Sequence, residues 1–215
     1  IAELAYAVGC AIVSVDYRLA PEHPYPAALD DAVAAVRWVA SGACSDGIDA
    51  QRIVLSGVSA GGGLAAATAL YLRDHEGPGL TALMLACPML DHRSDSFSAR
   101  QMVGAGSWDA TANAAAWGAY LGSDFQSDPS AYASAARADD LGGLPPTFID
   151  VGSAETFRDE CVAFADGIWR AGGDAELHVW PGGVHAFDFL APWAALSRAA
   201  RAERVAWLSR VLARS

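Results

Sequence analysis

One serine of this sequence is framed by residue types that could make it a nucleophile. The apolar run 53–56 leads into the pattern Gly-Val-Ser-Ala-Gly at 57–61, and an alanine-rich run of helical character, 64–70, follows. This arrangement is typical of a nucleophile elbow, in which a strand turns sharply into a helix and exposes the serine hydroxyl. The pattern predicts acyl transfer through a covalent intermediate on Ser59, with backbone N–H groups at the start of the following helix directed at the oxyanion.

The glycines of the pattern are expected to form the tight turn. Gly57 and Gly61 flank the serine, and a Cβ at either position is expected to collide with neighbouring backbone. A strand–helix turn without chemistry is the alternative that the pattern alone leaves open. A phosphate-binding loop is excluded because the chain contains no lysine. A dinucleotide site at 61–66 is disfavoured because no acidic residue stands about twenty positions further on.

A serine hydroxyl needs a base, and His185 is the predicted one. It lies in the glycine-rich segment 180–187, directly after the last predicted strand. In a parallel sheet such loops gather at the carboxyl ends of the strands, where the elbow also lies. Turn, surface or core positions without a catalytic role are expected for the other histidines, which are His23, His75, His92 and His178.

The base in turn needs a carboxylate, which should come between serine and histidine in the chain. Glu155 meets this requirement in the loop after the predicted strand 145–151, whereas Asp159 and Glu160 should already be helical. Asp150, at the end of that strand, is the rival acid. A first-turn helix acid that only favours the helix dipole is the other interpretation of Glu155.

Strands and helices alternate along the chain, which predicts a parallel sheet covered on both faces. Apolar strands are predicted at 11–17, 53–56, 80–87, 145–151 and 175–180, and helices at 1–9, 27–40, about 60–73, 155–171 and 194–213. The segment 91–140 is rich in Ser, Asp, Ala and Trp, with two predicted helices and no strand. It is interpreted as an insertion over the site, in which Trp108, Trp117 and Phe97 either shape an acyl pocket or simply pack.

Taken together, these features resemble the hormone-sensitive-lipase-like esterases (bacterial family IV) of the α/β-hydrolase superfamily. The matching segments are the elbow, 15–22, 25–31, 141–146, the Glu155 segment and 182–185. The resemblance implies an α/β-hydrolase core formed by 1–90 and 141–215, with a cap-like insertion at 91–140. It further implies hydrolysis of short- to medium-chain carboxylic esters by Ser59, His185 and Glu155 with Ala60 in the oxyanion hole, and no cofactor or metal.

The chain departs from the family pattern at three positions and at its start. Val58 stands where the family usually has Asp, and the pair Glu155-Thr156 stands where the family commonly has Asp-Pro. Ala186 follows the histidine at a position where the family usually has Gly. The family's His-Gly-Gly-Gly oxyanion loop would lie upstream of 11–17. We therefore expect about 80–100 further N-terminal residues in the natural protein. One of their strands should lie between those at 11–17 and 53–56.

Composition narrows the classes of partner. Apolar residues make up 53% of the chain and charged residues 18%, as in globular proteins. A net charge of −11 disfavours nucleic acid and anionic membranes. The four cysteines lack metal-type spacing and are predicted to be free thiols of a reducing, cytoplasmic compartment; they are Cys10, Cys44, Cys87 and Cys161. The expected partner is a small-molecule ester, and a homodimer stays open.

Two other functions remain compatible with the sequence. Some relatives of the family bind small ligands without hydrolysing them, so a non-catalytic or catalytically impaired binding protein is one alternative. An amidase or peptidase with the same three residues is the other, since it differs only in the leaving group.

Overall fold

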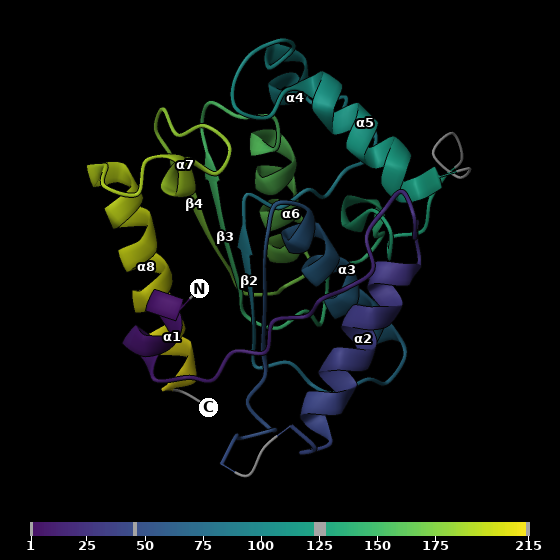
Figure 1. Cartoon of the computed structure of the whole chain (residues 1–215), viewed down its shortest axis with the longest axis vertical. Coiled ribbons are helices and arrows are strands. Elements are labelled where there is room, and N and C mark those ends of the chain that lie inside the picture. The colour runs from purple at the N-terminus through teal and green to yellow at the C-terminus, as the bar shows by residue number, and fades with distance from the viewer. Residues whose placement is uncertain (1, 45–46, 123–127, 214–215) are drawn as a thin grey trace.

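A four-stranded parallel sheet forms the centre of the protein (Figure 1). The computed structural model describes residues 2–44, 47–122 and 128–213. The strands are β1 (Val54–Val58), β2 (Ala82–Ala86), β3 (Thr147–Gly152) and β4 (Ala175–Trp180). They lie side by side in chain order, and every neighbouring pair is parallel. The predicted α/β class and four of the five predicted strands are therefore confirmed, with ends shifted by at most two residues.

Helices connect and cover these strands. The helices are α1 (Ala2–Val8), α2 (Ala27–Ala40), α3 (Ala60–Asp74), α4 (Phe97–Gln101), α5 (Ala110–Leu121), α6 (Arg158–Arg170), α7 (Phe187–Leu190) and α8 (Ala195–Leu212), with a 3₁₀ turn at Ala135–Arg137. The segment 91–140 holds α4 and α5 and no strand among its described residues. The short α7 was not predicted. In the described ranges no helix combines the length and the apolarity needed to cross a membrane.

Alternate residues of the central strands face different helices. Leu83 and Leu85 of β2 pack in one cluster with buried residues of α3 and α6. Met84, between them, packs in another cluster with Phe148 of β3 and Trp207 of α8. Figure 1 shows the same division, with α8 and α1 on one side of the sheet and α2, α3 and α6 on the other. Burial on both faces explains why β2 is a continuous apolar run.

The predicted strand at 11–17 is wrong for this structure. Residues 10–19 have no regular secondary structure, and the sheet begins at β1. The segment runs from α1 across to α2 (Figure 1), and its Ile12 and Val13 are 42% and 43% exposed. An apolar, β-branched run forms a strand only where a neighbour takes up its backbone hydrogen bonds. The described residues place no such neighbour beside it.

A buried carboxyl group joins α6 to the loop after β2. Glu160 is 5% exposed, and its Oε1 accepts a hydrogen bond from the Leu90 N–H at 2.7 Å. Burial raises the pKa of this carboxyl well above its usual value, although the backbone N–H groups of Leu90 and Asp91 oppose the shift. Glu160 therefore keeps its proton in the folded state over a pH range in which the unfolded chain has lost it.

Replacing Glu160 by Gln should change how stability depends on pH. Above about pH 4.5 the folded protein binds one proton more than the unfolded chain, so the free energy of unfolding falls as the pH rises. Glu160→Gln has no such proton to lose. As the pH rises, its free energy of unfolding relative to the parent should therefore increase by up to about 1.4 kcal/mol per pH unit, until the pH passes the pKa of Glu160 in the folded parent. Urea unfolding of both proteins between pH 4.5 and 8 measures this, and a constant difference would contradict it.

Candidate active site

Ser59 occupies the turn between β1 and α3 in a strained conformation. Its φ of 57° and ψ of −122° lie in a region that residues other than glycine rarely adopt. Two backbone hydrogen bonds hold it there: its N–H donates to the Ala86 carbonyl at 2.9 Å, and its carbonyl accepts from the Met89 N–H at 3.0 Å. Because Ser59 makes no side-chain cap to α3, its hydroxyl is available to another partner.

Close approach of other backbone segments requires glycine at some positions around Ser59, but these are not all the positions that the sequence predicts. A Cβ on Gly57 would stand 2.0 Å from the Gly61 carbonyl oxygen, as expected for a tight turn. The same expectation is wrong for Gly61, whose Cβ would meet nothing within 4 Å. Gly63, which was not predicted to be crowded, does need to be glycine, because a Cβ there would stand 1.9 Å from the Met89 carbonyl oxygen. Which glycine of a cluster is crowded depends on the loop packed against it, and that loop is remote in sequence.

Three side chains from separate parts of the chain form one line of hydrogen bonds. The Ser59 Oγ lies 2.9 Å from Nε2 of His185, which is 126 residues further along the chain. The other ring nitrogen, Nδ1, lies 3.2 Å from Oε1 of Glu155. Because a carboxylate can only accept, Nδ1 carries the proton of the neutral ring and Nε2 is free to accept from the serine hydroxyl. The predicted serine, histidine and acid are thus brought together.

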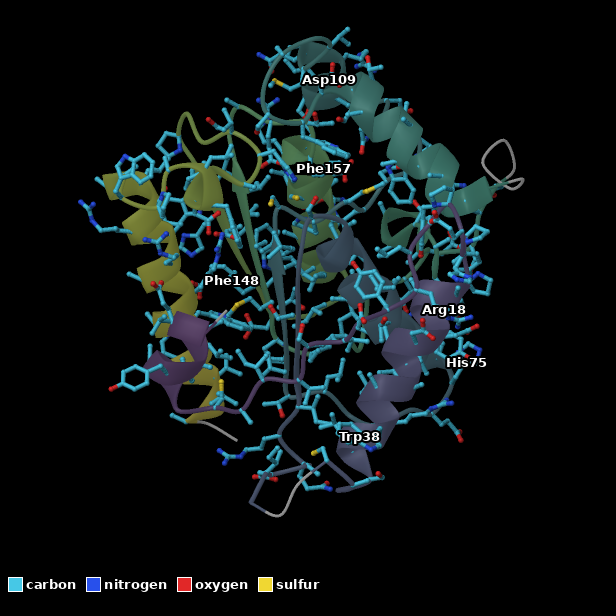
Figure 2. The ribbon with its side chains drawn as sticks, in the orientation of Figure 1. Arg18, Trp38, His75, Asp109, Phe148 and Phe157 are labelled. Carbon is cyan, nitrogen blue, oxygen red and sulfur yellow. The ribbon has the colours of Figure 1, made fainter. Side chains whose placement is uncertain are left out.

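The histidine and its carboxylate are enclosed. Glu155 is 1% exposed, and its Oε2 accepts a further hydrogen bond from the Gly152 N–H. The ring of Phe157 stands edge-on to the His185 ring, with 5.2 Å between their centres. Phe157 lies near the carboxyl ends of the strands, beside α6 (Figure 2). The Trp108 ring also lies near the imidazole, with 6.1 Å between the ring centres. Exclusion of water strengthens the electrostatic interaction between this pair.

Asp150, the rival acid, serves a different ion pair. Its Oδ2 lies 2.8 Å from Nη2 of Arg204 on α8 and also accepts from Nε1 of Trp180. Arg204 reaches in addition Asp188 of α7, at 2.6 Å. Burial raises the pKa of Asp150, and the Arg204 guanidinium opposes that shift. Strand alternation explains the outcome, since Ile149 faces α3 and α6 and its neighbour Asp150 therefore points toward α8.

Three of the other histidines lie apart from this line, whereas His23 lines a cavity together with Ala60. His75 stacks on Tyr71 at the end of α3, and His178 on β4 pairs with Glu176. His92 contacts Ser134, and burial lowers the pKa of its ring.

A small cavity adjoins the elbow. Its volume is about 230 Å³, and its lining residues include Ala60, Leu64, Tyr17, His23, Trp117 and Tyr120. Trp117, from the segment 91–140, lines this cavity, whereas Phe97 is 65% exposed and does not. A second cavity of about 410 Å³ is lined by Thr81, Thr147 and Asp174, at the amino ends of the strands and remote from Ser59. Because Ala60 directly follows Ser59, the cavity that it lines is the candidate site for a substrate group.

Ala186, the residue after the histidine, has left-handed backbone dihedrals, with φ 56° and ψ 31°. An L-residue with a side chain pays about 1–2 kcal/mol in this region, whereas glycine adopts it freely. Ala186→Gly should therefore raise the free energy of unfolding by about 0.5–1 kcal/mol, after the larger backbone entropy of glycine in the unfolded chain is subtracted. Urea unfolding measures the change, and a less stable variant would contradict the expectation.

Comparison with known proteins agrees with this geometry. Residues 1–189 match the family described as having the alpha/beta hydrolase fold. The chain belongs to the α/β-hydrolase family. Esterase LipI of Mycobacterium tuberculosis (strain ATCC 25618 / H37Rv) is 40% identical to this α/β-hydrolase over 167 residues, which are 78% of this chain and 52% of LipI.

Solved structures are similar throughout the chain. A bacterial heroin esterase superposes on this α/β-hydrolase with a TM-score of 0.94 and 37% identity, over 98% of this chain and 67% of the esterase. An esterase of the bacterial hormone-sensitive lipase family superposes with a TM-score of 0.85 and 34% identity, over 96% of this chain and 68% of the other. These similarities confirm the resemblance to hormone-sensitive-lipase-like esterases. The chain spans about half to three fifths of the length of the curated relatives it matches.

Proposed function

We propose that the protein is a serine carboxylesterase that hydrolyses short- to medium-chain carboxylic esters. The observation that supports this function best is the continuous line of hydrogen bonds from the Ser59 Oγ through His185 to Glu155, at 2.9 and 3.2 Å. Relatives that carry the name esterase, LipI among them, favour an ester over other acyl compounds. A line of hydrogen bonds with this order of groups is the arrangement by which a serine hydroxyl becomes a nucleophile.

The proposed reaction has two acyl-transfer steps. Nε2 of His185 takes the hydroxyl proton as Oγ of Ser59 attacks the acyl carbon, and Glu155 stabilises the imidazolium that forms. The Ala60 N–H, at the amino end of α3, donates to the oxyanion. The imidazolium then gives its proton to the leaving alkoxide oxygen, and the alcohol departs. Water attacks the acyl-enzyme with the same proton transfers, releasing the acid and restoring Ser59.

The cavity beside Ala60 limits the size of the group bound there. Its volume of about 230 Å³ lies below the range of about 300–1,000 Å³ typical of sites for drug-sized ligands. Apolar and aromatic side chains such as Leu64 and Trp117 favour a hydrocarbon chain. A short acyl group fits these properties best.

The segment 91–140 is proposed to act as a cap over this site. Ser107 donates a hydrogen bond to the His185 carbonyl at 2.7 Å, and the Trp108 ring lies against the imidazole. The core would then be formed by 1–90 and 141–215, as the sequence predicts. A cap that contacts the base can exclude water from the acyl-enzyme until the alcohol has left.

Location and partners stay predictions. All four cysteines are free, which supports a reducing compartment such as the cytoplasm. A small-molecule ester is the proposed partner, with neither nucleic acid nor a membrane, and a homodimer stays open.

A fluorophosphonate probe tests the proposed chemistry directly. The probe phosphonylates an activated serine with loss of fluoride, so we expect covalent labelling at a single peptide that contains Ser59, identified by mass spectrometry. Ser59→Ala should take up no label, whereas Ser209→Ala, which removes an exposed serine of α8, should label like the parent. A folded parent that takes up no label would favour the alternative of a non-catalytic small-ligand-binding protein. Turnover of matched ester and amide substrates would then separate an esterase from an amidase.

A further inference from the structure

Cys87 lies against the acid–base pair but has no part in the proposed reaction. It follows β2, is 6% exposed and has a φ of 38°. Its Sγ, a carboxylate oxygen of Glu155 and a ring nitrogen of His185 all lie within 4.8 Å of one another. A thiol, an imidazole and a carboxylate are the three side-chain types that bind zinc in proteins.

The spacing of the three atoms suits a tetrahedral metal ion after a small movement. Zinc binds sulfur at about 2.3 Å and nitrogen or oxygen at about 2.0–2.2 Å, so neighbouring ligands stand roughly 3.5 Å apart. Shifts of about 1 Å would bring the three side chains to that spacing from the present upper limit of 4.8 Å. Nδ1 is the ring nitrogen concerned, because it already faces Glu155 at 3.2 Å while Nε2 faces Ser59.

The charges of these ligands suit a buried divalent cation. A thiolate from Cys87 and the carboxylate of Glu155 carry two negative charges, and the imidazole of His185 is neutral. Their complex with Zn²⁺ has no net charge, which keeps the cost of burial low. Burial raises the pKa of the Cys87 thiol, and the metal supplies the positive charge that makes its deprotonation favourable.

A second cluster of the same kind is less suitable. Among the described residues Glu176, His178 and Glu203 also bring ligand atoms within 4.8 Å of one another. Arg210 lies between their carboxylates, 2.8 Å from Glu176 and 3.5 Å from Glu203. The guanidinium already balances the negative charge and would repel a cation. This cluster therefore serves as an internal control.

We propose that Cys87, Glu155 and Nδ1 of His185 form an inhibitory site for a thiophilic divalent cation such as Zn²⁺. Binding displaces the thiol proton to solvent and moves the Nδ1 proton to Nε2. An Nε2 that carries a proton cannot accept one from Ser59, so the base is blocked while the metal is bound. The inhibition rests on the proposed function, but the binding itself does not.

Zinc titration of fluorophosphonate labelling tests the inhibition. After preincubation with Zn²⁺, labelling of Ser59 should slow, and removal of the metal with EDTA should restore it. Cys87→Ser should label like the parent without zinc but need at least about 10-fold more Zn²⁺ for half-inhibition. His178→Ala, which disables the control cluster, should leave the zinc sensitivity unchanged. Equal sensitivity of parent and Cys87→Ser, or sensitivity lost in His178→Ala, would overturn the proposal.

Cobalt binding provides a readout that does not need activity. Co²⁺ bound to a thiolate shows a charge-transfer absorption band, which we expect in the parent and not in Cys87→Ser. Both proteins should also carry Cys10→Ser and Cys44→Ser, because these two thiols are only partly buried. A band that persists without Cys87, or no band in the parent, would overturn the site even if labelling succeeds. A band together with no labelling would leave the site standing and contradict only the proposed function.

Discussion

Ser59→Ala should lower kcat/KM for ester hydrolysis by about 10⁴- to 10⁶-fold. The hydroxyl is the only group in the line of hydrogen bonds that can form the acyl-enzyme, so its removal leaves only substrate binding and the oxyanion donor. The strained backbone of Ser59 is held by hydrogen bonds of its own N–H and carbonyl. Alanine keeps both, and the variant should therefore fold. Initial rates with a short-chain aryl ester measure the effect, with unfolding curves to verify stability.

His185→Ala should lower kcat/KM by a similar factor, and its effect should not multiply with that of Ser59→Ala in the double variant. His185→Ala removes the acceptor at 2.9 Å from the Ser59 Oγ, and a serine without its base is a weak nucleophile. When two groups act as a unit, removing either one loses nearly all of the rate enhancement that they provide together. The double variant should therefore be no slower than the slower single variant. His75→Ala removes a histidine remote from the site and is the matched control. Multiplicative losses in the double variant would show that the two side chains act independently.

Arg204→Met should destabilise the fold by about 3–5 kcal/mol. The guanidinium is the cation between two buried carboxylates, Asp150 on β3 and Asp188 on α7, which are 1% and 7% exposed. Methionine retains most of the aliphatic volume but leaves both carboxylates without a counter-charge. Among the described residues, Oδ1 of Asp150 has no hydrogen-bond partner, and the Trp180 Nε1–H that donates to Oδ2 carries no charge to replace that of Arg204. Urea unfolding at neutral pH measures the loss.

Two further variants separate charge from packing in this prediction. Adding Asp150→Asn and Asp188→Asn to Arg204→Met removes the uncompensated charges, so part of the lost stability should return. Arg198→Met, which removes an exposed arginine of the same helix, should change the stability by less than about 0.5 kcal/mol. If the triple variant is as unstable as Arg204→Met alone, lost packing around the side chain and not buried charge is responsible.

Local patterns were sufficient for most of the fold. The period of apolar residues predicted α2 at the bounds the structure has, and β4 likewise. The turn from β1 into α3 followed from the glycines around Ser59, because a sharp strand–helix turn demands small residues within a few positions of each other. Elements of this kind are encoded by neighbours in sequence, so they can be predicted without knowing what packs against them.

The strand predicted at 11–17 failed for the opposite reason. Its pattern is that of a strand, but a strand exists only through hydrogen bonds to another segment, and the described residues provide none there. The glycine assignments show the same limit. Gly63 is crowded by the Met89 carbonyl, which approaches only after the chain has folded, while Gly61 is not crowded at all.

By itself, the sequence determined which serine, which histidine and which class of acid could act together, because each is marked by residues beside it or by its order in the chain. The sequence favoured Glu155 over Asp150, but only the tertiary structure showed why Asp150 is out of reach: Arg204 of α8 holds it, while Glu155 contacts the imidazole. The tertiary structure also brought Cys87 against that pair. Such choices depend on contacts between segments distant in sequence, which packing of the whole core sets and no local pattern records.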